Sequence, residues 1–196
     1  MRSPNSFINH SDKKPKDDIS RVQMNIPTSE RLILVTGGAR SGKSAYAEQL
    51  ALSLNKSPYY IATAEAFNDE MQARIEIHQA RRGPDWTTIH APLDLEQALI
   101  SSDDGRPRLV DCLTIWLNNL IYHEKDSGDY LDRLCATLNT QRSPVIMVTN
   151  EVGSGIVPMD RLARQFRDSA GEMNQMLAQL CDAVYVSISG LPLRLK

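Results

Sequence analysis

The sequence predicts an α/β fold in which helices cover both faces of a mostly parallel central sheet. Short apolar runs, beginning with Leu32–Thr36, are typical of strands buried on both faces, and they alternate with segments of helical periodicity. A glycine-rich turn joins the first apolar run to the first helical segment. Strands that alternate with helices in this way usually pair in parallel, and ligands then bind at their carboxyl ends.

The chain has 196 residues, a length typical of one domain. Residues 1–30 are polar, carry both charge signs and contain three prolines, so we expect a disordered N-terminal extension before a domain at residues 31–196. The net charge of −2 argues against nucleic-acid binding through bulk charge. Three widely spaced cysteines without a Cys-x-x-Cys pair suit a reducing compartment, and neither a secretory signal nor a membrane span is evident. We therefore expect a cytoplasmic protein.

The first half of the domain supplies three expected strands and three expected helices. The strands are residues 32–36, 59–62 and 86–90, and each is a short run of apolar, aromatic or β-branched side chains. Helical spacing of apolar residues predicts helices at 43–54 and 69–82, the second capped by Asn68, and a short helix at 94–100.

The second half supplies three more strands and three more helices. The turn signal Asp104-Gly105-Arg106-Pro107 precedes an expected strand at 109–112, and Pro144 precedes another at 145–149. The last expected strand is residues 183–188. Periodicity predicts helices at 113–121, 130–142 and 160–180, the last after a loop at 150–158 that contains glycine and proline.

The strongest functional signal lies between the first strand and the first helix. The segment fits the phosphate-binding pattern G-x-x-x-x-G-K-[ST] and consists of Gly37, Gly38, Ala39, Arg40, Ser41, Gly42, Lys43 and Ser44. Glycines let successive N–H groups converge, and the helix start presents further N–H groups to phosphate oxygens. The sequence therefore predicts a P-loop NTPase-type three-layer sandwich that binds ATP or GTP, with Lys43 reaching the β and γ phosphates.

An acidic side chain at the end of a second buried strand commonly completes such a site. Asp111 follows the apolar run at 109–110, so we expect Ser44 and Asp111 to bind Mg²⁺ beside the nucleotide. A carboxylate in a surface turn is the alternative interpretation of Asp111.

Two histidines are candidate nucleotide-site residues. His78 shares one side of the expected helix 69–82 with Arg74, Arg81 and Arg82, whose guanidinium groups match phosphate oxygens. A neutral imidazole there could attack phosphorus and form a phosphoramidate, although a lone histidine on a helix is more often structural. His90 ends the expected strand 86–90, where it could contact a nucleotide.

The P-loop alone leaves the reaction open. We find no Asn-Lys-x-Asp element for reading guanine, which disfavours a GTP switch, and no basic excess, which disfavours a DNA-linked ATPase. A small-molecule kinase or a nucleotidyl transferase remains.

Three segments together are similar to the bifunctional adenosylcobinamide kinase / adenosylcobinamide-phosphate guanylyltransferase family of cobalamin biosynthesis. They are VTGGARSGKS, IATAEAFNDEMQARIEIHQARR and VTNEVGSGIVPMDRLARQFRDSAGEMNQ. The resemblance covers residues 31–196 and implies two reactions. A nucleoside triphosphate first phosphorylates the aminopropanol hydroxyl of adenosylcobinamide, and GTP then donates GMP through a guanylylated histidine.

The resemblance also implies roles for particular residues. The family's nucleophile matches His78, its P-loop matches residues 37–44, and its acidic residue at a strand end matches Asp111. Further nucleotide contacts match two segments, Ala62, Thr63 and Ala64 in the first and Gln79, Ala80, Arg81 and Arg82 in the second. The family further implies a homotrimer with clefts between neighbouring subunits.

The sequence departs from the family pattern at His90, where the family has an acidic residue that binds the guanine edge. A carboxylate can accept two hydrogen bonds from guanine, whereas a neutral histidine can accept one. Either guanine is recognised elsewhere or its selectivity is weaker. Two alternative functions therefore stay open, a kinase without guanylyl transfer and a nucleotide-dependent binding module.

Arg161, Arg164 and Arg167 recur every three residues at the start of the last expected helix. They predict either a solvated charged face or a wall that faces phosphate or a neighbouring subunit.

Overall fold

The computed structural model describes residues 30–55, 57–65 and 83–196. These residues form a seven-stranded sheet in the order β3-β2-β4-β5-β1-β6-β7. The strands are β1 (Leu32–Gly37), β2 (Tyr59–Ala62), β3 (Thr87–His90), β4 (Arg108–Asp111), β5 (Val145–Val148), β6 (Ala183–Ile188) and β7 (Leu191–Arg194). Strands β1 to β6 pair in parallel and β7 is antiparallel to β6. The mostly parallel α/β sheet is confirmed.

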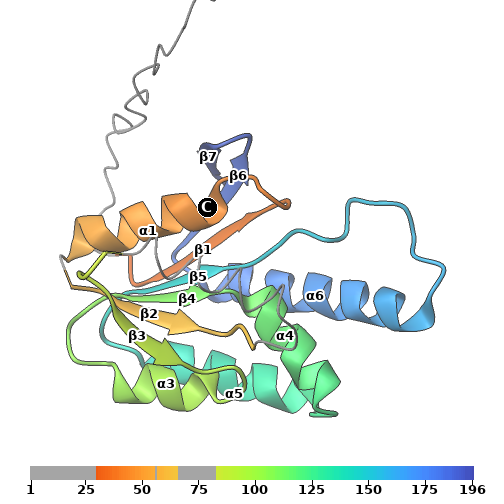
Figure 1. Cartoon of the computed structure of the whole chain (residues 1–196), viewed down its shortest axis with the longest axis horizontal. Coiled ribbons are helices and arrows are strands. Elements are labelled where there is room, and N and C mark those ends of the chain that lie inside the picture. The colour runs from red at the N-terminus through yellow and green to blue at the C-terminus, as the bar shows by residue number, and fades with distance from the viewer. Residues whose placement is uncertain (1–29, 56, 66–82) are drawn as a thin grey trace, which may run out of the picture.

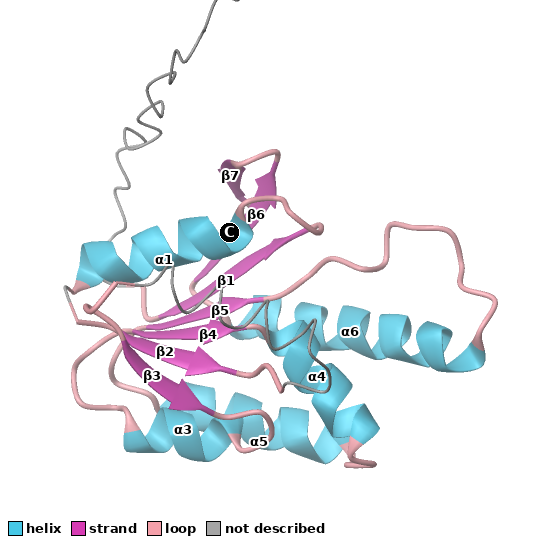
Figure 2. Cartoon of the chain, viewed as in Figure 1, coloured by secondary structure: helices cyan, strands magenta, loops and turns pink. Residues whose placement is uncertain are grey.

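Helices cover both faces of this sheet, as the alternating pattern predicts (Figures 1 and 2). They are α1 (Lys43–Leu54), α3 (Leu95–Ser101), α4 (Leu113–Tyr122), α5 (Ser127–Thr140) and α6 (Arg161–Leu180). α1 packs on one face, where Ala47, Leu50 and Ala51 meet one set of strand side chains. The other described helices pack on the opposite face, where Trp116, Leu134 and Leu177 meet the other set.

Consecutive residues of β1 divide between the two cores. Ile33 and Val35 face α1, whereas Leu32 and Leu34 face the larger group of helices. Because successive side chains of a strand point to opposite faces, a strand buried on both faces needs an unbroken apolar run. This requirement explains why the run Leu32-Ile33-Leu34-Val35 predicts a strand at the centre of the sheet.

The expected elements in the described residues are present, with boundaries that differ by at most three positions. Side chains that cap helix starts explain two of the shifts. Asp126 accepts hydrogen bonds from the N–H groups of Gly128 and Asp129, so α5 begins before the first apolar residue of its pattern. Asp160 likewise accepts from the N–H of Ala163 and stands just outside α6. The expected helix 69–82 and residues 1–29 of the expected extension 1–30 lie outside the described residues. Glu30, the last residue of that extension, is described, buried and ion-paired with Arg194.

The sequence analysis missed β7. A two-residue turn with positive φ at both Ser189 and Gly190 reverses the chain after β6 and sets Ile188 opposite Leu191. β7 is short, contains Pro192 and carries its leucines mostly exposed, features that fit an edge strand and weaken its sequence signal. This antiparallel hairpin lies next to the P-loop.

Candidate nucleotide site

The predicted site residues that the structure describes come together at the carboxyl ends of the parallel strands. The register sets Ala62 opposite His90 on one side and opposite Asp111 on the other. Asp111 is opposite Val148, and Val148 is opposite Val35, two residues before Gly37. The sheet thus aligns the P-loop, Asp111, Ala62 and His90 along one edge, with His90 on the outer strand four positions from β1.

The P-loop is a tight turn that requires glycine at two positions. Gly37 has a φ of 149°, and a Cβ there would lie 2.5 Å from the carbonyl oxygen of Ser187. Gly42, at the N-cap of α1, has a φ of 93°, and its Cβ would lie 3.0 Å from the Cα of Gly190. Neither position accepts a larger residue without displacement of backbone.

The end of β6 and the turn after it hold the P-loop in place through two hydrogen bonds. The carbonyl oxygen of Ser41 accepts hydrogen bonds from the Gly190 N–H at 2.8 Å and from Ser187 Oγ at 2.6 Å. Sequence reasoning did not identify Ser187 or Gly190, because they lie about 150 residues from the loop that they hold. The Ser41 hydroxyl is buried and has no hydrogen-bond partner in the described structure.

Lys43 lies largely buried at the start of α1. Its Nζ donates to the Gly38 carbonyl oxygen at 3.0 Å, so the side chain folds back across the loop. Burial lowers the pKa of Lys43, while nearby Cys112 and Asp111 oppose that shift. A desolvated ammonium attracts phosphate oxygens more strongly than a hydrated one does.

Asp111 is half-buried at the end of β4 and is held in place by Tyr60. The Tyr60 hydroxyl donates to Asp111 Oδ2 at 2.9 Å, and the Tyr60 ring packs edge-on against Trp86 at 5.8 Å between ring centroids. Its position beside Lys43 at a buried strand end excludes the surface-turn interpretation.

Within the described ranges, no group of three or more His, Cys, Asp or Glu side chains could hold a metal ion. Mg²⁺ does not need such a group, since proteins usually hold it with one or two oxygen ligands together with substrate phosphates and water. The Ser44 hydroxyl and the Asp111 carboxylate are donors of the required kind.

Thr63 forms hydrogen bonds with the backbone of Cys112. The side chain is completely buried, and its Oγ1 donates to the Cys112 carbonyl oxygen at 2.9 Å and accepts from the Cys112 N–H at 2.8 Å. The Thr63 hydroxyl therefore ties the end of β2 to the start of α4, and a nucleotide contact by Thr63 stays a prediction. Ala62 is also buried, whereas Ala64 is half-exposed at the rim.

Comparison with known proteins identifies the family of this fold and site. A family model described as cobinamide kinase / cobinamide phosphate guanyltransferase matches residues 33–195. The chain belongs to this family. The match includes the P-loop, Asp111 and the β6–β7 hairpin.

Two curated relatives have the name bifunctional adenosylcobalamin biosynthesis protein. CobP of Pseudomonas aeruginosa is 44% identical over 168 residues, which cover 83% of this chain and 96% of the relative. CobU of Escherichia coli K12 is 40% identical over 182 residues, which cover 84% and 99%. A solved structure from Pyrococcus horikoshii OT3 has a TM-score of 0.50 and 9% identity over 85% of this chain and 86% of that one, and this likeness concerns the fold alone.

Other residues that family resemblance implicates lie outside the described part of the chain. They are His78, Gln79, Ala80, Arg81 and Arg82. His90 is described and exposed, at the outer end of the aligned strand ends.

The three arginines at the start of α6 do not form one uniform face. Arg164 donates to the carbonyl oxygens of Pro158 and Met159 at 2.8 and 2.6 Å, and so fixes the end of the loop after β5. Arg167 pairs with Asp168, and Arg161 is exposed. Arg164 is thus a structural residue of the loop rather than part of a wall facing phosphate.

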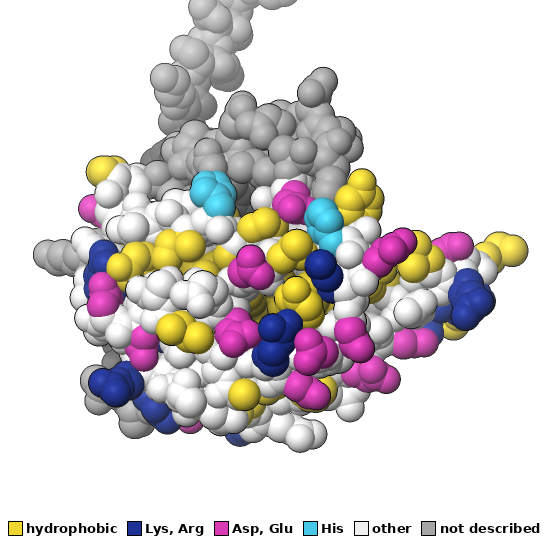
Figure 3. All heavy atoms as spheres, turned by 90° about the horizontal axis from the view of Figure 1, so that it is seen from below, with side chains coloured by type: hydrophobic (Ala, Val, Ile, Leu, Met, Phe, Trp, Pro, Cys, Tyr) yellow, Lys and Arg dark blue, Asp and Glu magenta, His cyan; other side chains and the backbone are white. Residues whose placement is uncertain are grey.

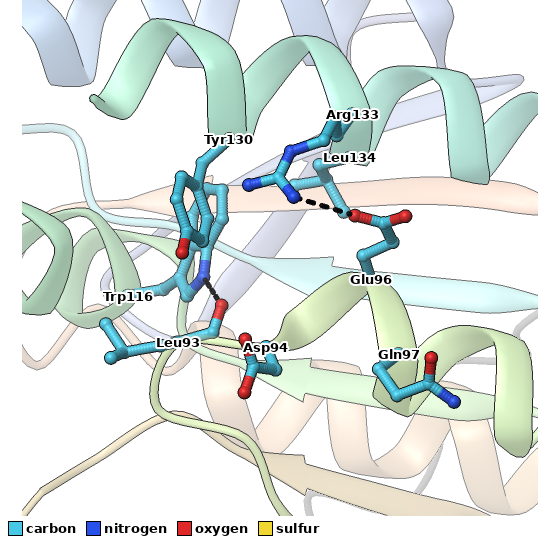
Figure 4. Close-up of a pocket in the computed structure, with 8 residues that line it drawn as sticks. All are labelled: Leu93, Asp94, Glu96, Gln97, Trp116, Tyr130, Arg133 and Leu134. Atoms are coloured by element: carbon cyan, nitrogen blue, oxygen red, sulfur yellow. Dashed lines mark hydrogen bonds and ion pairs between the residues drawn. The ribbon is translucent and has the colours of Figure 1, made fainter. Parts of the chain in front are cut away.

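A cavity of about 210 Å³ lies away from the P-loop, among α3, α4 and α5 (Figure 4). Its lining combines Trp116, Tyr130 and Leu134 with charged residues, and Arg133 pairs with Glu96 at 3.7 Å. Its lining has no glycine-rich backbone, and the carboxylates of Asp94 and Glu96 at the start of α3 would repel phosphate oxygens, so this cavity does not have the features of a phosphate site. On the face seen in Figure 3, acidic, basic and apolar side chains of the described residues are interspersed, which matches the small net charge.

Proposed function

We propose that this chain phosphorylates adenosylcobinamide and then transfers GMP to the product. The observation that carries the proposal is the P-loop with Lys43 and Asp111 at the strand ends, in a chain that belongs to the cobinamide kinase / cobinamide phosphate guanyltransferase family.

In the first reaction, the aminopropanol hydroxyl oxygen attacks the γ phosphorus of ATP or GTP. The bond between that phosphorus and the bridging β–γ oxygen breaks, the nucleoside diphosphate leaves, and the hydroxyl proton passes to solvent. The converging N–H groups of the P-loop and the Lys43 ammonium stabilise the charge on the transferred group.

In the second reaction, an imidazole nitrogen of His78 attacks the α phosphorus of GTP and pyrophosphate leaves. A phosphate oxygen of the cobinamide phosphate then attacks the same phosphorus, the P–N bond breaks, and adenosylcobinamide-GDP forms. Arg81 and Arg82 are proposed to hold the phosphates, because guanidinium groups bind such oxygens bidentately.

Mg²⁺, when bound, would neutralise charge on the phosphate oxygens. Ser44 and Asp111 are the residues proposed to hold it, and Tyr60 keeps the Asp111 carboxylate oriented.

A kinase without guanylyl transfer is the second candidate. The observation that favours it is His90, at a position where the family resemblance implies an acidic residue. A neutral histidine can accept one hydrogen bond from guanine, whereas a carboxylate can accept two. We propose His90 as a guanine contact in the bifunctional enzyme.

We further propose a homotrimer located in the cytoplasm. Exposed apolar side chains support association between copies, since large exposed patches usually mark interfaces. They occur in the loop after β5, at the start of α6 and along the β6–β7 hairpin and the residue after it, at Ile156, Val157, Met159, Leu162, Ile188, Leu191, Leu193 and Leu195. No helix in the described part of the chain is long and apolar enough to cross a membrane.

The decisive experiment incubates pure protein with Mg²⁺ and GTP labelled at the α phosphate, followed by denaturing separation. We expect acid-labile, base-stable label on the wild type and none on His78→Ala. His10→Ala, in the N-terminal extension, is the matched histidine control and should retain the label. A folded wild type that binds GTP and transfers phosphate to cobinamide but takes no label would select the kinase alternative.

A further inference from the structure

Three side chains along one face of α4 and its C-cap form hydrogen bonds with neighbouring loops. Trp116, Asn119 and His123 are spaced by three and four residues, so they lie in a row along the helix and its C-cap. Each forms a hydrogen bond with a residue that follows β2 or β3 within three positions. These two strands end with Ala62 and His90, which are candidate nucleotide contacts.

Asn119 joins the two strand exits directly. It is completely buried, and its Nδ2 donates to the Thr63 carbonyl oxygen at 2.7 Å and to the Pro92 carbonyl oxygen at 3.0 Å. Trp116 adds a second bond on the β3 side, from Nε1 to the Leu93 carbonyl oxygen at 2.9 Å (Figure 4).

The Asn119 amide is therefore used as a double donor. Its Oδ1 is buried and accepts no hydrogen bond in the described structure. A buried acceptor without a partner destabilises the folded state, so this side chain is not the best choice for packing alone.

His123 extends the same row to the β2 exit. Its Nε2 lies 2.9 Å from Glu65 Oε2, and both side chains are partly exposed. Glu65 immediately precedes residues 66–82, which contain His78. Asn119 and His123 thus hold Thr63 and Glu65, which lie two residues apart and directly precede residues 66–82 in the sequence.

We infer that Asn119 and the His123–Glu65 pair are positioning residues for guanylyl transfer. Asn119 fixes the ends of β2 and β3 relative to each other, and the His123–Glu65 pair holds the β2 exit against the end of α4. The P-loop is held independently by Ser187 and Gly190. The inference rests on the proposed function, because it assigns the β2 and β3 exits to the GMP-carrying half of the enzyme.

The His123–Glu65 pair provides the cleanest test, because partly exposed side chains can be removed with little effect on folding. The experiment compares Glu65→Ala, His123→Ala and the double variant with the wild type in two assays, GMP labelling of the protein and phosphate transfer to cobinamide. We expect each single variant to slow labelling about three- to tenfold, and the double variant to be no slower than the worse single variant. Phosphate transfer should stay within about twofold of wild type.

Two further variants separate positioning from a general loss of structure. His123→Gln keeps a donor and should restore most of the labelling rate, and Asn118→Ala, an exposed neighbour on α4, should change neither assay. Asn119→Leu removes both donors at similar volume and should slow labelling more than either surface variant.

The inference is overturned if labelling is unchanged in the single variants, if their effects simply multiply in the double variant, or if both activities fall in parallel. An unlabelled wild type has a different meaning, since it overturns the proposed guanylyl transfer itself.

Discussion

The two ends of the parallel sheet surround a buried cation differently. At the amino end, Arg108 is completely buried and bonds Asp103 at 2.6 Å, Gln141 at 2.8 Å and the Ser143 carbonyl at 3.0 Å. At the carboxyl end, Lys43 is buried with the carbonyl of Gly38 as its hydrogen-bond acceptor. Buried atoms without a partner in the described structure occur at both ends, namely Arg108 Nε and Glu30 Oε2 at the amino end and oxygens of Thr36, Ser41 and Asn119 at the other.

The difference in partners separates a cation that serves the fold from one that serves a ligand. A buried cation that bonds a carboxylate and several further oxygens, as Arg108 does, stabilises one arrangement of loops. A buried cation with one backbone acceptor, as Lys43 has, keeps most of its charge for a ligand. Variants at the amino end should therefore change stability, and variants at the carboxyl end should change chemistry.

The largest expected effect is on stability and comes from the amino end. Arg108→Ala leaves Gln141 without a charged partner and Asp103 without its ion pair, so we expect the free energy of unfolding to fall by about 3–5 kcal/mol. Denaturant unfolding measures this loss, and the folded fraction should keep its nucleotide affinity. Arg142→Ala, an exposed neighbour, is the control, and a loss of nucleotide binding by folded Arg108→Ala would contradict the division between the two ends.

Lys43→Ala should give the largest effect on chemistry. Both phosphate transfer and guanylyl transfer should fall about 10²- to 10³-fold, because one buried cation serves both. Rates of the two reactions on folded protein provide the measurement, and Lys125→Ala is the exposed control. Guanylyl transfer that persists in Lys43→Ala would mean that the two reactions use separate phosphate sites.

Gly37→Ala should affect both stability and nucleotide binding. The new Cβ would meet backbone of Ser187 at a φ of 149°, which we expect to cost about 1–3 kcal/mol and to weaken nucleotide affinity. Gly171→Ala is an instructive control, because Gly171 lies within α6 with open space around it and alanine should stabilise the helix by about 0.5–1 kcal/mol. Thermal unfolding with and without nucleotide measures both effects. Equal changes in melting temperature for Gly37→Ala and Gly171→Ala would count against a specific role for the P-loop glycine.

The smallest effect concerns pH. Burial opposes the charge of Asp103, but hydrogen bonds from Arg108, Ser143 and the Arg142 backbone lower its pKa below the usual value. A lowered pKa contributes stability above the unfolded-state value near 4, and this contribution is lost as pH falls through the folded-state pKa. Asp103→Asn should therefore reduce stability at pH 7 and flatten its dependence on pH below about 4, in unfolding curves compared with exposed Asp132→Asn. An unchanged slope would show that Asp103 does not govern acid unfolding.

The sequence predicted most of the fold because its strongest signals are local. Runs such as Val145–Val148 and the P-loop pattern require only neighbouring residues, and the parallel sheet then aligns Asp111 with the end of β2. What could not be predicted depends on distant contacts. Ser187 supports Ser41 from 146 positions away. Nothing in the sequence distinguishes Asn119 from its neighbour Asn118 until the partners of Asn119 after β2 and β3 are known.

Thr63 is a second residue whose contacts depend on a distant part of the chain. Its place after β2 fits a ligand contact, yet its hydroxyl is occupied by the Cys112 backbone. The position of Thr63 in the sequence shows at which end of the sheet the residue lies. The direction of its side chain depends on the Cys112 backbone, between β4 and α4, which the position of Thr63 in the sequence does not reveal.

The support of Ser41 by the β6–β7 turn has a consequence for synthesis on the ribosome. The phosphate-binding segment leaves the ribosome early, but the turn that holds it follows about 150 residues later. At a translation rate of about 5–20 residues per second, the nascent chain spends roughly 8 to 30 seconds without that support. An incomplete chain would therefore hold nucleotide poorly, and the ability to consume GTP would arise only when β6 and its turn have joined the sheet.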